Sequence, residues 1–187
     1  VAQAKSNNAL TTGVTTPTIS DGDISTQSGL KDSISRHSTE KANTITITDT
    51  TVAAAALNTL NDKTSVAVTA SAITTLTGTI AAVDTALDAG VAGTITGLGN
   101  EAVTLTDTSG VAVAALNTLD GLTTGKINAG TVTAMSGALT ALNTAYASNG
   151  ITGLGNETLT VSDTGSVAAS DLNTFCLLYT SPSPRDS

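Results

Sequence analysis

An asparagine recurs through this sequence in one local setting. It follows a leucine and precedes a threonine at Asn58, Asn117, Asn143 and Asn173. A row of amides could contact a sugar or an ion. Alternatively, each amide satisfies main-chain groups at the turn after a helix, as most buried polar side chains do. The structural interpretation is favoured.

An aspartate recurs in a similar way, followed each time by threonine, at Asp49, Asp107 and Asp163. Carboxylates bind calcium, but the ion takes several oxygens at once, and one carboxylate in each repeat is too few. Neither an EF-hand loop nor the Gly-Gly-x-Gly-x-Asp repeat is present. We therefore expect Asx turns or helix caps at these aspartates, and the sequence predicts no metal site.

The other candidates for chemistry are weaker. The segments 97–100 and 153–156 both read Gly-Leu-Gly-Asn and lack the third glycine of a dinucleotide-binding loop, so they are predicted to be turns with positive φ. His37 is the only histidine and has no partners for a catalytic triad or a zinc site. With no nucleophile motif and no paired carboxylates, the sequence predicts neither an enzyme nor a cofactor.

The segment before each of these aspartates alternates between an aliphatic residue and Thr or Ser: Thr44–Thr48, Val103–Thr106 and Leu159–Ser162. This alternation is typical of a half-buried strand with its aliphatic side chains inside. The outward threonine rows resemble those of flat ice-binding proteins. The simpler interpretation is β-propensity on a solvated face.

Alanine-rich segments follow the strands and are predicted to be short helices. Three of them are Val52–Asn61, Val111–Asp120 and Val167–Phe175. Thr51, Ser109 and Ser166 are the candidates for capping them. Two further helices are predicted at Thr79–Asp88 and Gly137–Ala147.

The longest internal match gives the repeat length. Ile95–Leu119 returns as Ile151–Phe175, with 15 of 25 positions identical and starts 56 residues apart. The Leu/Val-Asn/Asp-Thr signature recurs at about half that spacing, which predicts stacked units of about 28 residues. Each unit would hold a short strand and a short Ala-rich helix, with a parallel sheet along the stack. The predicted fold class is an α/β repeat solenoid; the alternatives are a pure β-helix and a string of small β-rich modules.

Composition excludes some partners. Only 2% of the residues are aromatic, so a core must be built from small aliphatic side chains. The net charge of −8 argues against nucleic acid, which needs a basic surface. The longest apolar run, Val52–Leu57, falls short of the roughly 18–20 residues of a membrane helix, so no membrane insertion is predicted.

Three regions are predicted. Residues 1–42 read as a degenerate N-terminal repeat, 43–175 as the repeat solenoid and 176–187 as a non-native tail. Cys176–Asp186 resembles the translated read-through of a transposase sequencing adapter and holds the only cysteine. Because the chain begins with Val1 rather than Met, we expect an internal fragment of a longer protein.

The DTxVAAxxLNTLD and LTTG motifs resemble the repeats of long bacterial secreted or cell-surface proteins. The resemblance covers Leu10–Phe175 and implies an extended, non-catalytic stalk, spacer or adhesive segment outside the cell. Its partners would be other segments of the same parent chain. The alternative function is a repeat array that binds calcium, a surface glycan or ice; a third is a scaffold for an enzyme elsewhere in the parent chain.

Overall fold

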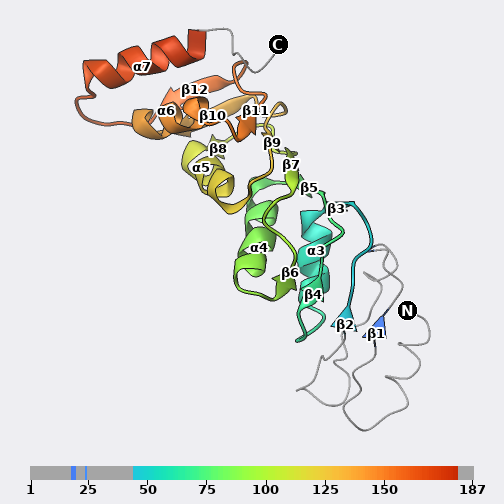
Figure 1. Ribbon diagram of the computed structural model, residues 1–187. Helices are drawn as coiled ribbons and strands as arrows, with labels where there is room; N and C mark the ends of the chain where they lie inside the picture. The colour runs from blue at the N-terminus through green and yellow to red at the C-terminus, as the bar shows by residue number, and fades with distance from the viewer. Residues whose placement is uncertain (1–17, 20–23, 25–43, 181–187) are drawn as a thin grey trace.

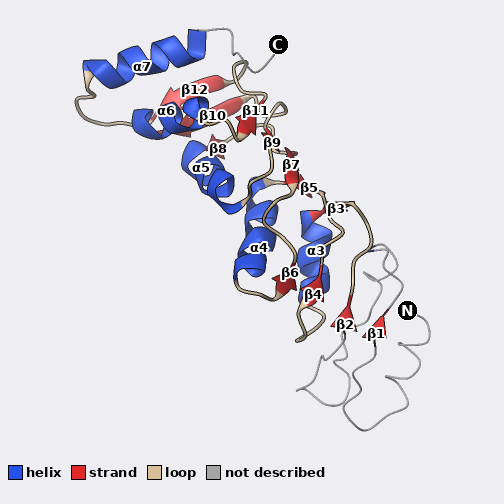
Figure 2. Cartoon of the chain, in the orientation of Figure 1, coloured by secondary structure: helices blue, strands red, loops and turns tan. Residues whose placement is uncertain are grey.

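The computed structural model describes residues 18–19, 24 and 44–180. Over residues 44–180 the chain forms an elongated body in which short strands alternate with short helices (Figure 1). Helices and short strands follow one another along the length of this body (Figure 2). The architecture is α/β, and the strands form parallel sheets.

The described helices follow one another along the body and pack in chain order, each against the next. They are α3 (Ala54–Asn61), α4 (Ile80–Val91), α5 (Val113–Leu122), α6 (Leu139–Ala147) and α7 (Ala169–Thr180).

The strands lie in four parallel sheets in the described residues. The largest has the order β11-β9-β7-β5-β3, with β3 (Thr51–Ala53), β5 (Thr75–Gly78), β7 (Ala102–Leu105), β9 (Ile127–Asn128) and β11 (Ile151–Thr152). A second has the order β12-β10-β8, with β8 (Val111–Ala112), β10 (Ala134–Gly137) and β12 (Thr158–Val161). The two-stranded sheets pair β4 (Val68–Thr69) with β6 (Ile95–Thr96) and β1 (Thr18–Ile19) with β2 (Thr44–Ile45).

The register of the largest sheet explains the alternating sequence. Successive partners across its five strands form one inward row, Val52, Leu76, Val103, Ile127 and Ile151, and every one of these side chains is buried. Because side chains alternate across a strand, their neighbours face outward. The predicted inward aliphatic pattern is confirmed in this sheet.

The buried side chains form one continuous cluster that runs from Ile45 to Ile151. Its members are aliphatic apart from Met135 and Tyr146. Each fully buried aliphatic side chain stabilises the fold by about 1.5–3 kcal/mol. Since the cluster is continuous, the alternative of separate β-rich modules is wrong.

The alanine-rich segments are helical, so the alternative of a pure β-helix is also wrong. Two of these helices begin later than predicted, because Val52 and Val111 belong to β3 and β8. Sheet register buries both valines, and β-branched residues suit a strand better than the first turn of a helix. Similarly, α7 begins at Ala169 rather than Val167.

Thr51 and Ser109 precede α3 and α5 without capping them. The N-cap residues of these helices are Ala53 and Ala112, and neither makes a side-chain cap. By contrast, Thr79, predicted to open a helix, is the N-cap of α4, where its Oγ1 accepts from the main-chain N of Ala82 at 3.3 Å.

The strand–helix units vary around the predicted 28 residues. The ladder and capping bonds between neighbouring units join residues 24 to 28 apart in sequence, and Thr123 bonds Glu101, 22 residues before it. One cause of the variation is α4, which has 12 residues where its counterpart α6 has 9. The three additional residues come close to one turn, so the buried face of the helix stays in line.

The ends of the predicted regions are partly described. Most of residues 1–42, predicted to be a degenerate N-terminal repeat, lie outside the described residues. At the other end, α7 continues past Phe175 to Thr180, across the predicted boundary at residue 176. The adapter origin of residues 176–187 stays a prediction.

Candidate functional site

Three of the recurrent asparagines each join a helix to the one that follows it. Their Nδ2 atoms donate to main-chain carbonyls: Asn58 to Ala82 at 2.9 Å, Asn117 to Ala141 at 2.9 Å and Asn143 to Asp171 at 3.1 Å. In every case the donor is the fifth residue of its helix and the acceptor is the third residue of the following helix. We call these bonds the amide ladder.

The amide ladder explains why asparagine occupies this position. A helix already satisfies its own carbonyls, yet a carbonyl has two lone pairs and can accept a second donor. The Oδ1 atoms of Asn58, Asn117 and Asn143 are buried and make no hydrogen bond in the described structure. The side chains therefore act as donors to main-chain groups, as expected, but the acceptor lies in the next helix rather than in the turn that follows.

Asn117→Ala is expected to lower the free energy of unfolding by about 1 kcal/mol, the net value of one hydrogen bond. Chemical denaturation with urea would measure it. The matched control is Asn173→Ala, because Asn173 is the fifth residue of α7, is exposed, and has no following helix in the described chain. The control should change stability by less than about 0.5 kcal/mol; equal losses would contradict the ladder.

The recurrent aspartates accept main-chain N–H groups of the unit before their own. The Oδ2 atoms accept as follows: Asp49 from Ile24 at 2.8 Å, Asp107 from Ile80 at 2.8 Å and Asp163 from Leu139 at 2.7 Å. Ile80 and Leu139 are the first residues of α4 and α6. A carboxylate at this end satisfies a free N–H group and complements the helix dipole. The predicted capping role is present, across units rather than within one.

The aspartates are not arranged as a metal centre. In the part of the chain that the structure describes, no three or more His, Cys, Asp or Glu side chains lie close enough together to hold a metal ion. Asp107 and Asp163 instead each use one oxygen on a helix terminus, and Asp49 accepts from the main-chain N of Ile24. The capping geometry accounts for the recurrence of these residues.

Threonine hydroxyls make a third set of bonds between units. Several donate to a main-chain carbonyl of the neighbouring unit: Thr74 to Thr50 at 3.1 Å, Thr96 to Val68 at 3.3 Å, Thr131 to Leu105 at 3.0 Å and Thr152 to Ile127 at 3.1 Å. An outward row of the largest sheet aligns Ala53, Thr77, Thr104, Asn128 and Thr152. The row is therefore not uniform in threonine, unlike a regular ice-binding face.

Two glutamates that the sequence analysis did not single out are almost completely buried. Glu101 is 0% exposed and Glu157 is 2% exposed. Their Oε2 atoms accept from the main-chain N of Gly99 and of Gly155, both at 2.8 Å, and the Oε1 atoms are buried without a partner. Each glutamate thus closes its own glycine turn. The sequence signal for this role was the glutamate that follows Gly-Leu-Gly-Asn in both copies of the repeat.

The glycine turns also touch neighbouring units. Thr123 Oγ1 donates to the main-chain O of Glu101 at 2.8 Å, and Thr124 N donates to the main-chain O of Gly99 at 2.9 Å. Gly97 and Gly99 have φ of 90° and 125°, which confirms the predicted positive φ. The turn is a contact point between units, and the structure gives no phosphate-binding geometry there.

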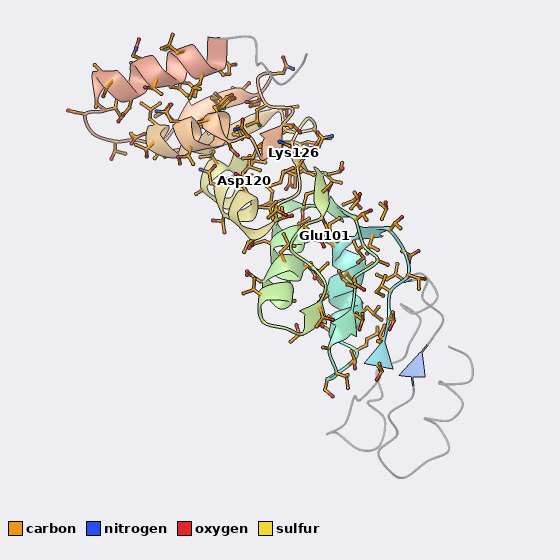
Figure 3. All side chains as sticks on the ribbon, viewed as in Figure 1. Glu101, Asp120 and Lys126 are labelled. Carbon is orange, nitrogen blue, oxygen red and sulfur yellow. The ribbon has the colours of Figure 1, made fainter. Side chains whose placement is uncertain are left out.

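Charged side chains contribute to the same kind of contact. Figure 3 labels Glu101 before β7, Asp120 near the end of α5 and Lys126 just before β9. Asp120 Oδ2 accepts from Ser148 Oγ at 2.6 Å, and Lys126 Nζ donates to the main-chain O of Asn149. Both reach into the turn of the following unit.

Two candidate residues remain, His37 and Cys176. His37 lies outside the described residues, and Cys176 lies exposed on α7. None of the described helices combines the length and the hydropathy needed to cross a membrane. The recurrent asparagines, aspartates and threonines therefore form hydrogen bonds between neighbouring units.

Comparison with known proteins identifies no similar protein. No family model, no curated protein and no solved structure matches this chain. The case for a function therefore rests on the chain's own sequence and geometry.

Proposed function

We propose that residues 43–175 are a segment of an α/β solenoid that serves as a non-catalytic stalk, spacer or adhesive segment in a larger extracellular or cell-surface protein of bacterial type. The observation that carries the proposal is the use of the recurrent polar side chains. The asparagines, aspartates and several threonines all bond a neighbouring unit. Because the recurrent polar side chains form contacts between units, the chain suits a mechanical role.

The energetics of such an array support the proposal. In a stacked array, stability is a sum of unit terms and nearest-neighbour interface terms. Here the interfaces combine a shared aliphatic row and parallel strand pairing, and three of the four described helix pairs add an amide-ladder bond. Length can then increase by adding units without any change in the interface.

Apolar side chains are exposed on β12, on α7 and just before α7, and a further unit of the parent chain would cover them. Val161, Val167 and Leu172 are 43%, 41% and 48% exposed. The residues at the matching repeat positions, Leu105, Val111 and Leu116, are 1%, 4% and 0% exposed because the following unit covers them. The same sequence positions would be covered here by one more strand–helix unit.

The function is tested by lengthening the array. A variant in which residues 95–150 are duplicated is expected to remain folded and to increase its maximum dimension by roughly 10 Å, since two more units add two strand spacings. Small-angle X-ray scattering would measure the increase. A duplicated chain that grows equally in all directions, or that leaves the second copy unfolded, would contradict the proposal.

A ligand-binding array for calcium, a glycan or ice is the alternative function. It would be favoured if millimolar calcium raised the melting temperature, because a ligand stabilises the state that binds it, or if the protein reshaped growing ice crystals. Under the mechanical proposal, neither response is expected.

A further inference from the structure

One rung of the amide ladder has different chemistry. The fifth residue of α4 is Asp84, where α3, α5 and α6 have Asn58, Asn117 and Asn143. The third residue of α5, the position that accepts in every other step, is Ala115. Helix α4 packs against α5 as the other successive helices pack against one another.

An ionised carboxylate cannot act as this rung. It only accepts hydrogen bonds, whereas the ladder needs a donor to a main-chain carbonyl. In the described structure Asp84 Oδ1 is buried and has no hydrogen-bond partner. The α4–α5 step therefore lacks the bond that the other steps have.

No cationic side chain lies within the described helices and strands that pack most closely against α4. These elements are α3, α5, β5 and β6. Within their bounds, α3, β5 and β6 carry no ionisable side chain, and α5 carries only Asp120. Burial raises the pKa of Asp84 above its usual 3.8, and negative Asp88 on the same helix raises it further.

We propose that Asp84 is a proton-controlled rung of the amide ladder. When the carboxyl group takes a proton from solvent, its O–H donates to the main-chain carbonyl of Ala115 and joins α4 to α5. When it loses the proton, the donor disappears and a negative oxygen faces a carbonyl dipole. The step closes when the carboxyl group is protonated and opens when it ionises.

The direction follows from linkage. Because the pKa of Asp84 is raised in the folded chain, its contribution to stability is fully present below the usual pKa of 3.8 and is lost as the pH rises through the raised value. This step is also the one in which the chain runs through β6, β7 and β8 between helices, whereas the other steps contain two strands. The loss would therefore loosen a joint in the middle of the body.

The test is Asp84→Asn, which installs the residue that the other three steps already use. At pH 7 the variant is expected to melt at a higher temperature than the natural chain and to protect the amides of α4 and α5 from hydrogen exchange roughly tenfold better. As the pH is lowered below the usual pKa of 3.8, the difference between the two chains should shrink and disappear. Protection factors, rather than raw exchange rates, are compared, because intrinsic exchange itself depends on pH.

Asp88→Asn is the matched control on the same helix. It removes the exposed negative neighbour but keeps the titrating rung, so it should retain the pH response and move its midpoint to lower pH. If Asp84→Asn and the natural chain have the same melting temperature at pH 7, or if their difference does not change with pH, the proposal is wrong. It is also wrong if Asp88→Asn abolishes the pH response.

Discussion

Leu116→Asp is expected to unfold α4 and α6 together with α5. Leu116 is fully buried in the continuous aliphatic cluster, so the substitution removes a core side chain and places a charge with no partner there. The cost should be about 4 kcal/mol or more, a large fraction of the stability of an ordinary domain. Hydrogen exchange read by mass spectrometry would report each helix separately.

The control for this substitution is built into the repeat. Leu172 is the fourth residue of α7, as Leu116 is of α5, but it is 48% exposed. Leu172→Asp should therefore cost less than about 1 kcal/mol. If Leu116→Asp removes protection in α5 alone, while α4 and α6 keep theirs, the units are independent and the solenoid proposal fails.

Local patterns predicted the elements of this chain because burial and local sequence agree there. In Thr44–Thr48 and Val103–Thr106 the aliphatic residues alternate with threonine, and they are buried in the structure: Ile45, Ile47, Val103 and Leu105. The pattern weakens at Leu159–Ser162, where Val161 is exposed because the described chain supplies no unit to cover it. Periodicity predicts which face is apolar, but it does not say whether a neighbour is present.

Contacts between units could not be predicted from local sequence. An Asx turn or a helix cap was predicted at Asp107 without saying which helix, and the structure shows that it accepts from Ile80 in the preceding unit. Which helix terminus a carboxylate reaches depends on how far successive units are shifted, and no local propensity encodes that shift. The acceptor of Asn117 in α6 was missed for the same reason.

The burial of the two glutamates could not be predicted from the sequence either. Glu101 reads as a surface residue in a short turn, because glutamate is almost never fully buried unless it is paired. The structure buries it under the turn that it closes, where the main-chain N of Gly99 satisfies one oxygen. Its repetition as Glu157 was visible in the sequence, but repetition alone does not separate a turn-closing residue from a solvated one.

Gly97→Ala is expected to lower the free energy of unfolding by about 3 kcal/mol. Gly97 has φ of 90°, where a side chain is strained, and a Cβ at this position would lie 2.7 Å from the main-chain Cα of Ser71. Ser71 belongs to the preceding unit, between β4 and β5, so relief of the clash requires two units to move apart. Denaturation with urea would measure the loss.

Gly99→Ala separates the two causes of that loss. Gly99 also has positive φ, at 125°, but a Cβ there meets nothing within 4 Å, so this variant should lose only about 1 kcal/mol from backbone strain. The second copy of the turn offers an independent repeat, because a Cβ on Gly153 would lie 2.7 Å from the main-chain N of Gly130, whereas one on Gly155 meets nothing. If each pair of variants shows equal losses, the glycines serve only the turn, and the close approach of neighbouring main chains is not what fixes the distance between units.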